Sequence, residues 1–372
     1  GVLSTPLNPL VTFRDDPLRV LRAVRFAARF AFRLDAPLAV AAAASEIREA
    51  LAGKVSRERV GLELEGMLSG KSARPAVALA LLLRRLRLAD VVFAGPPFQT
   101  AQTEPPAPAT GYNWGAALEA VRWVSRLIAH GRVDGGGGGR EGDEGGGGGE
   151  EAGGSSSCVL ACSGWAVTTP TEPQPGWRLE FLAAALLPLA GVTCLEKKGR
   201  PGPAAAFVVR ESLKLKLKDA ADIATILGNL GAWQGAAATA APAVAAGALP
   251  DRLELGLLVR ACKDLWRPCI TVACAAEIVA AVGAGTGGGT AAGKAGSENS
   301  AKARYDALVD AVLRLGLDGV WTMKPLLDGK VLATRLGVPK GPATGKVLEE
   351  QVRWQLGHPE GDADACAAHL TA

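Results

Sequence analysis

Residues 12–30 read Thr-Phe-Arg-Asp-Asp-Pro-Leu-Arg-Val-Leu-Arg-Ala-Val-Arg-Phe-Ala-Ala-Arg-Phe and predict an amphipathic helix. Two carboxylates, Asp15 and Asp16, precede Pro17, and acids followed by proline are typical of a helix start. A helix turns by about 100° per residue, which predicts one apolar face and one basic face. The apolar face is Val20, Leu21, Val24, Ala27, Ala28, Ala31 and Phe32, and the basic residues are Arg19, Arg22, Arg25 and Arg29.

The start of this helix carries an acid and an arginine that allow two interpretations. Asp16 and Arg19 are three residues apart, so we expect their side chains to meet on one surface. The first interpretation is an ordinary solvated ion pair. The second is base recognition, because a carboxylate accepts from an exocyclic amino group and a guanidinium donates to a ring nitrogen. Cytosine and adenine share that edge, whereas uracil and guanine reverse it, so such a pair selects C and A.

The segment resembles motif D of the class II tRNA nucleotidyltransferases, the CCA-adding enzymes, and of the related bacterial poly(A) polymerases. The consensus E-D-x-x-R matches Asp15–Arg19, except that Asp15 replaces Glu. The family's R-A-x-R-F run is similar to residues 22–26, and its T-P-L-D-P lead-in is similar to residues 5–9, where Asn8 replaces Asp.

The resemblance implies roles for the residues of this motif. Asp16 and Arg19 are expected to template the incoming base, with Asp15 beside them. Arg22 is expected to face the nucleotide's phosphates. Arg25 is expected to support the helix without touching the nucleotide.

A second motif follows at Ser56-Arg-Glu-Arg-Val-Gly-Leu-Glu-Leu64, which resembles the family's motif E, S-x-E-R-I-x-x-E-L. Ser56 is predicted to be a helix N-cap. Glu58, Arg59 and Glu63 match the motif, and we interpret them as a charge network that braces the motif D helix rather than as chemistry.

Composition favours an all-α fold. Hydrophobic residues make up 48% of the 372 residues but aromatic residues only 5%, and much of the apolar share is alanine, the strongest helix former. The resemblance implies a multi-helix neck, body and tail, poly(A) polymerase C-terminal-like, with two low-complexity insertions. The predicted segments are 1–11, the end of a head domain; 12–94, the neck; 95–130 and 158–283, the body; 131–157, a disordered Gly/Glu-rich insertion; 284–302, a linker; and 303–372, a tRNA-binding tail.

Lysines in the body and tail are the candidate RNA contacts. Arg210-Glu-Ser-Leu-Lys-Leu-Lys216 resembles a segment of plant and algal CCA-adding enzymes, and the alternation of Lys214, Lys216 and Lys218 is consistent with an edge strand. Residues 234–249 are predicted to be a variable loop. In the tail, Lys324, Lys330 and Lys340 are expected to meet the tRNA backbone. The alternative is that these are ordinary solvated lysines.

The catalytic carboxylates of the family are not found in this sequence. Nucleotidyl transfer uses Mg²⁺ held by carboxylates, and the resemblance implies that they come from a head domain as Gly-Ser followed by Asp-x-Asp. Asp362-Ala-Asp364 matches by spelling only, because no Gly-Ser stands shortly before it, and Gly296-Ser297 likewise leads to no nearby Asp-x-Asp. We therefore expect no metal ligands here, and we expect the chain by itself to be inactive and to supply nucleotide selection and tRNA binding.

The resulting hypothesis is tRNA 3′-terminal CCA addition from CTP and ATP. Three alternatives stay open: a poly(A) polymerase of the same superfamily, a non-catalytic RNA-binding protein without a head, and a helical scaffold without RNA affinity. Residues 1–90 hold 15 Lys/Arg against 9 Asp/Glu, which fits a phosphate-bearing partner. Seven scattered cysteines, no visible signal peptide and no uninterrupted apolar run of membrane-spanning length predict an intracellular protein. We expect neither membrane nor DNA as a partner, and the compartment stays open.

Overall fold

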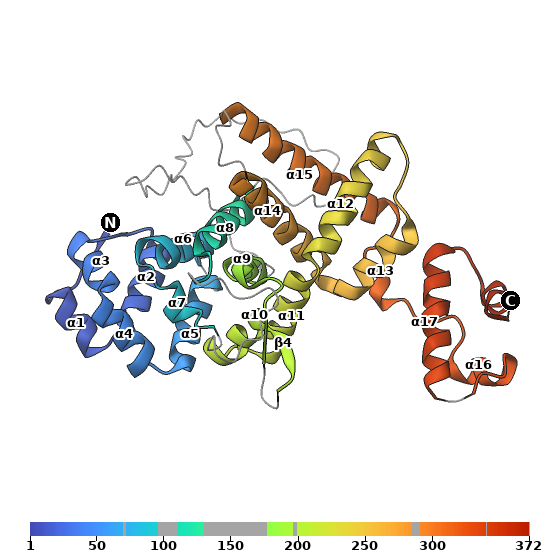
Figure 1. Ribbon diagram of the computed structural model, residues 1–372, viewed down its shortest axis with the longest axis horizontal. Helices are drawn as coiled ribbons and strands as arrows, with labels where there is room; N and C mark the ends of the chain where they lie inside the picture. Colours follow the sequence, from blue (N-terminus) through green and yellow to red (C-terminus); the bar gives the residue numbers. More distant parts are fainter. Residues whose placement is uncertain are drawn as a thin grey trace, which may run out of the picture. The chain divides into compact units, whose positions relative to one another are not determined.

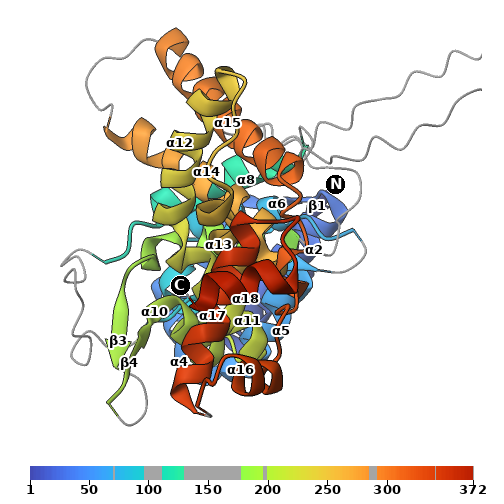
Figure 2. The same ribbon diagram turned by 90° about the vertical axis from the view of Figure 1, so that its right-hand side faces the viewer.

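The computed structural model describes residues 1–69, 72–95, 111–129, 177–195, 199–284, 291–339 and 341–371. Helices account for most of these residues, which confirms the predicted all-α class. Two small sheets accompany them: β1 (Val2–Leu3) pairs in parallel with β2 (Arg33–Leu34), and β3 (Thr193–Leu195) pairs antiparallel with β4 (Pro201–Pro203) (Figure 2). The predicted insertion 131–157 and Lys340 lie outside the described residues.

The chain divides into two compact units. One comprises Gly1–Leu230 with Pro268–Glu298, and the other comprises Gly231–Arg267 with Asn299–Ala372. This differs from the predicted boundary between body and tail, because residues 231–267 group with the last helices. The predicted linker 284–302 is wrong from residue 291 onward, where helix α15 (Ala291–Arg314) begins. Alanine, lysine and glutamate are good helix formers and outweigh the glycines in that stretch.

The helices of the first unit surround an aliphatic, alanine-rich core. Helix α2 packs on α5, and α8 packs on α9 (Figure 1). Up to residue 230, its helices are α1 (Pro9–Asp15), α2 (Arg19–Phe30), α3 (Ala36–Ala43), α4 (Ser45–Lys54), α5 (Arg57–Leu68), α6 (Pro75–Ala80), α7 (Ala89–Val92), α8 (Trp114–Ala129), α9 (Trp177–Ala185), α10 (Ala204–Phe207) and α11 (Leu217–Gly228). They are joined by π-helical turns η1 (Leu81–Arg85) and η4 (Val208–Ser212) and by a 3₁₀ turn, η3 (Leu187–Leu189).

The predicted first helix is two helices. Helix α2 begins at Arg19, directly after the two acids and Pro17 as expected, but the residues before them form a separate helix, α1, which ends at Asp15 and was not predicted. The Asn8–Pro9 pair causes this, since Asn8 accepts from the Leu10 N–H at 2.9 Å and proline occupies the first helical position. The apolar face of α2 is buried as predicted up to Ala28, but Ala31 is left-handed and Phe32 is exposed.

The predicted edge strand at Lys214, Lys216 and Lys218 is also wrong. Residues 213–216 form an irregular turn after η4, and α11 begins at Leu217. Lys214 has a left-handed backbone with φ of 50°, which is incompatible with an extended strand. The helix start is stabilised by Asp219, whose carboxylate accepts from the Lys216 N–H at 3.3 Å.

The remaining helices are long and alanine-rich in the middle of the chain and shorter towards its end. They are α12 (Leu230–Ala245), α13 (Arg252–Cys262), α14 (Trp266–Ala284), α15, α16 (Gly329–Arg335), α17 (Pro342–Gly357) and α18 (Ala363–Thr371), with 3₁₀ turns η5 (Lys263–Leu265) and η6 (Val320–Thr322). Helix α12 occupies the predicted variable loop 234–249, which is therefore wrong up to residue 245. Helices α16 to α18 pack around Leu332, Trp354 and Cys366 (Figure 2).

Among the described residues, one helical stretch is long and apolar enough to span a membrane by length and composition. It is Arg252–Val282, with a mean hydropathy of 1.6 in its most apolar window. Half of that window is buried inside the protein, and buried core helices of soluble proteins have the same composition. The expected absence of a membrane partner stays a prediction.

Candidate functional site

The junction between α1 and α2 fixes the position of Asp16. Its backbone N–H donates to the Thr12 carbonyl at 3.3 Å and closes α1. Its Oδ1 accepts from the Leu18 N–H at 3.1 Å, which stabilises the turn that leads into α2. Pro17 has no N–H to donate, so the Asp16 carboxylate accepts from the next residue, Leu18. The other oxygen, Oδ2, accepts from Arg59 of α5 at 3.3 Å.

Arg19 pairs with Asp15 rather than with Asp16. Its Nη2 lies 2.8 Å from Asp15 Oδ2, and its Nη1 donates to the Thr12 carbonyl at 3.1 Å. The predicted Asp16–Arg19 contact assumed one continuous helix, and that assumption fails because Asp16 closes α1. The described contacts instead place two neighbouring pairs at the start of α2, Asp15–Arg19 and Asp16–Arg59.

Glu63 of α5 binds two arginines of α2. Oε1 accepts from Arg22 Nε at 3.0 Å, and Oε2 accepts from Arg25 Nε at 2.8 Å. The Glu63 side chain is only 10% exposed. Arg25 also lies over the Phe26 ring, with its guanidinium carbon 4.5 Å from the ring centroid. The carboxylate therefore stabilises the basic face of α2, which agrees with the bracing interpretation.

Among the described contacts, the other motif E residues have different partners: Arg59 contacts Asp16 just before α2, and Glu58 does not. Ser56 caps α5 as predicted and accepts from the Arg59 N–H at 3.5 Å, and Arg59 reaches Asp16. Glu58 is not part of the network that contacts α2, so this part of the expectation is wrong. Hydrogen bonds from its own backbone N–H and from Ser56, with the charge of Lys214, hold the pKa of Glu58 below its ordinary value.

The candidate RNA-binding lysines are exposed where they are described. Lys214 Nζ lies 3.0 Å from Glu211 of the same turn, and Lys216 is exposed at the start of α11. In the second unit, Lys324 and Lys330 are exposed around the turn that precedes α16. Exposure is compatible with RNA contact and with plain solvation, so the assignment stays a prediction.

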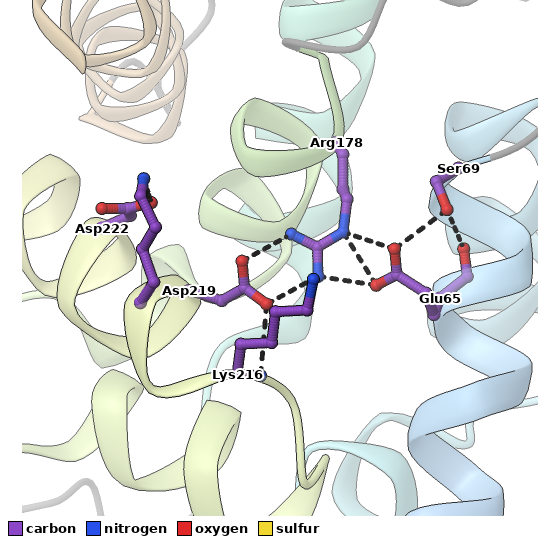
Figure 3. Close-up of polar contacts among 7 residues, drawn as sticks. Glu65, Ser69, Arg178, Lys216, Asp219 and Asp222 are labelled. Carbon is purple, nitrogen blue, oxygen red and sulfur yellow. Dashed lines mark hydrogen bonds and ion pairs between the residues drawn. The ribbon is translucent and has the colours of Figure 1, made fainter. Parts of the chain in front are cut away.

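Sequence reasoning missed Arg57 and Arg178, two arginines that fix α5. Arg57 donates to three backbone carbonyls, and burial lowers its pKa. Arg178 of α9 lies between Glu65 and Asp219 (Figure 3). Glu65 is 113 residues and Asp219 is 41 residues away from Arg178 in the chain. No local sequence pattern therefore predicts these contacts.

The described part of the chain offers no cluster of three His, Cys, Asp or Glu side chains able to hold a metal ion. The carboxylates of the site already bind arginines or backbone N–H groups. Asp364, part of the Asp-x-Asp spelling, pairs with Arg335 at 2.6 Å. The donor set described here therefore does not fit the Mg²⁺ that the resemblance implies, and no chemical step is assigned to it.

Comparison with known proteins finds distant relatives that match along nearly the whole of this chain but along only part of their own length. The tRNA nucleotidyltransferase cca2 of Schizosaccharomyces pombe is 26% identical over 99% of this chain and 62% of its own length. The mitochondrial CCA tRNA nucleotidyltransferase of Saccharomyces cerevisiae is 26% identical over 100% of this chain and 62% of its own length. No protein-family model matches the chain.

Among solved structures, the fold resembles the Thermotoga maritima CCA-adding enzyme complexed with tRNA. The TM-score is 0.50 at 16% identity, and the match covers 100% of this chain and 63% of that one. At this identity the likeness concerns the fold alone. The chain spans less than two thirds of the relatives it matches. The relatives named here are fungal and bacterial, so the plant- or alga-like character stays a prediction.

Proposed function

We propose that this chain is the nucleotide-selecting and tRNA-binding part of a nucleotidyltransferase that adds C and A to tRNA 3′ ends. The observation that carries the proposal is the start of α2, where Asp16 and Arg19 stand in the motif D frame and each holds an exchangeable partner. Similarity to tRNA nucleotidyltransferases along the whole chain supports the same reading.

Base selection follows from the chemistry of these two side chains. Arg19 is bound to an exposed carboxylate, Asp15, and exposed ion pairs contribute only about 0–1 kcal/mol. The Asp16–Arg59 contact at 3.3 Å is long for a charge-assisted hydrogen bond. An incoming base replaces both partners: Asp16 accepts from the exocyclic amino group, and Arg19 donates to the ring nitrogen. Uracil and guanine leave both groups mispaired, which penalises them.

Arg22 is assigned to the phosphates of CTP and ATP. Its contact with Glu63 uses Nε, and its side chain is about half exposed. The guanidinium thus has further donors for phosphate oxygens, and guanidinium groups bind phosphates with matched geometry. Arg25 is more buried and serves the packing of α2 on α5 instead.

The remaining assignments are part of the same proposal. Lys214, Lys216, Lys324, Lys330 and Lys340 contact the tRNA backbone, with Lys340 outside the described residues. Mg²⁺ activates the RNA 3′-hydroxyl in nucleotidyl transfer, and residues other than those described here would hold it. An intracellular location is consistent with the mitochondrial relative in yeast. DNA is not proposed as a partner.

The test is incorporation into tRNA that lacks its CCA end, with sequencing of the added nucleotides. C-C-A ends from CTP and ATP are expected in the protein that carries this chain. Oligo(A) ends would assign it to the poly(A) polymerases. Salt-dependent tRNA binding without incorporation would make it an RNA-binding protein only. Absence of tRNA binding would favour the remaining alternative, a helical scaffold without RNA affinity.

A further inference from the structure

Helix α5 makes contacts on two opposite sides. Arg59 and Glu63 lie one turn apart on one side: Arg59 reaches Asp16 at the junction of α1 and α2, and Glu63 reaches the arginines of α2. Gly66 continues this side, because a methyl group added there would lie 2.8 Å from Arg25 Cδ. Arg57, Gly61 and Glu65 are spaced by four residues, and at about 100° per residue they lie on the far side of the helix. The nucleotide-selecting face and an anchoring face thus share one helix.

The first anchor is Arg57 in the first turn of α5. Its Nε donates to the Ser212 carbonyl at 2.6 Å, its Nη1 to Val91 at 2.9 Å and its Nη2 to Val92 at 2.6 Å. These carbonyls belong to the ends of α7 and η4, so one planar guanidinium fixes the start of α5 against two separate segments.

The second anchor is a close backbone approach at Gly61. A Cβ placed there would lie 1.8 Å from the carbonyl oxygen of Leu213. The neighbour is backbone and not the end of a flexible side chain, so it has little freedom to move away. Glycine is required at this position for α5 to lie directly on the turn after η4.

The third anchor is the arginine fork at Arg178 (Figure 3). Its Nε donates to both Glu65 oxygens at 2.7 and 2.8 Å, and its Nη atoms donate to the two Asp219 oxygens at 3.0 Å. Ser69 Oγ donates to Glu65 Oε1 at 2.9 Å and orients that carboxylate. Burial alone would lower the pKa of Arg178, but the hydrogen bonds and charges of Glu65 and Asp219 outweigh it and raise that pKa.

We propose that Arg178 is a positioning residue for nucleotide selection, which acts through Glu65 to fix the helix that presents Glu63 to Arg22 and Arg25 of α2. The inference rests on the proposed function of α2. Arg178 belongs to α9 and touches none of the α2 residues in the described contacts. Arg178 acts on α2 through the backbone of α5. Glu65, which it binds, is half a helical turn from Glu63, and Glu63 binds the arginines of α2.

The geometry explains why this contact matters for selection. Base discrimination needs donors and acceptors held to within about 0.5 Å. The two-point contact of Arg178 with Glu65, from Nε to Oε1 at 2.7 Å and from Nη2 to Oε2 at 2.6 Å, defines position and orientation of α5 together, which a single-point ammonium contact does not. Without the fork, α5 keeps its anchors at Arg57 and Gly61, which precede Glu63, but loses the one that follows it.

The test separates the two carboxylates of the fork. Glu65→Gln weakens the α5 side, Asp219→Asn weakens the α11 side, and Arg178→Met removes both. The dissociation constants of CTP, ATP, UTP and GTP are measured for each full-length variant by equilibrium dialysis, with thermal unfolding alongside. Arg178→Met and Glu65→Gln are expected to lower the preference for CTP over UTP about tenfold. Asp219→Asn is expected to change it less than about twofold, although it also destabilises the protein.

Three outcomes overturn the inference. In the first, all variants lower the melting temperature but keep the wild-type preference, so the fork is only structural. In the second, Asp219→Asn reduces the preference as much as Glu65→Gln, so the loss reflects general destabilisation. In the third, the wild-type protein binds all four nucleotides equally, and then the proposed function fails with it. If Arg178→Met does not fold, Arg178→Lys replaces it, with an expected loss of about threefold because the charge stays and the fork is lost.

Discussion

The carboxylates that contact the arginines of α2 differ sharply between the start of that helix and its middle. Glu63, in the middle of the α2–α5 contact, is buried and uses each oxygen for one arginine. Asp15, at the end of α1 just before α2, is 67% exposed and pairs with Arg19 alone among the described contacts. A buried carboxylate with both oxygens occupied keeps a structure in place, because removing it leaves the more buried of its two arginines, Arg25, without its acceptor. An exposed carboxylate can exchange its partner for a ligand at little cost.

The strongest way to break this comparison is Glu63→Ala. The change leaves Arg22 and Arg25 without their shared acceptor and is expected to lower the free energy of unfolding by about 3 kcal/mol. Denaturant unfolding measures it. The control is Glu46→Ala, which removes an exposed pair with Arg14 and should cost less than about 0.5 kcal/mol. If both variants lost the same free energy of unfolding, the burial of Glu63 would not contribute to stability.

The buried side of α5 is tested next by Gly61→Ala. The added methyl group meets the Leu213 carbonyl, and the resulting overpacking is expected to cost about 2 kcal/mol. Gly53→Ala is the matched control, because Gly53 lies in α4 with nothing within 4 Å of the added methyl. The control should gain about 0.5 kcal/mol from better helix propensity. A neutral Gly61→Ala would show that α5 and the turn after η4 are loosely packed.

Asp16→Ala probes the exposed end. Loss of the acceptor for the Leu18 N–H is expected to cost about 1 kcal/mol of stability. The larger effect is on ligand choice: the preference for CTP and ATP over UTP and GTP should fall by at least about tenfold, measured by nucleotide competition in the incorporation assay. Unchanged nucleotide preference, with the expected loss of stability, would reduce Asp16 to a structural cap.

Asp15→Asn should have a smaller effect on stability than any of these. The exposed pair with Arg19 contributes at most about 0.5 kcal/mol, and chemical unfolding is the measurement. Its effect on nucleotide preference should be smaller than that of Asp16→Ala, because only the neighbouring carboxylate is assigned to the base. A loss of stability as large as that of Glu63→Ala would contradict the division between exposed and buried carboxylates.

The smallest effect concerns pH. The pKa of Glu58 is lowered in the folded protein, so its contribution to stability is fully present above its ordinary pKa and is lost as the pH falls through the lowered folded value. An NMR titration of the glutamate side chains should show Glu58 protonating below the ordinary pKa of a glutamate. Lys214→Met should move its pKa upward. A pKa at or above the ordinary value would mean that the Glu58 carboxylate does not accept the hydrogen bonds described above.

The sequence predicted those parts of the site that depend on local rules. The buried face of α2 from Val20 to Ala28 follows from helical periodicity, and Ser56 follows from capping preferences. The partner of Arg19 was not predictable in the same way, because Asn8 and Pro9 create a separate helix that ends at Asp15. The signal for that helix, an Asn cap before a proline, stands in the sequence.

The anchors of α5 were beyond sequence reasoning for another reason. Arg57 binds main-chain carbonyls, which carry no side-chain identity that a pattern could reveal. Gly61 is required by a contact with Leu213, far along the chain. The lysine alternation at 214–218 suggested a strand, but the end of η4 and the left-handed Lys214 impose a turn.

The separation of Glu65 and Arg178 in the chain also has a consequence for the order of folding. The contacts of Glu63 with Arg22 and Arg25 join residues 41 and 38 apart, whereas the Glu65–Arg178 contact joins residues 113 apart. Closing the longer loop costs more chain entropy, and contacts distant in sequence form more slowly. We therefore expect α2 and α5 to associate early and α9 to dock afterwards. The fine geometry of the nucleotide-selecting end would then be acquired late, after its arginines have already been paired.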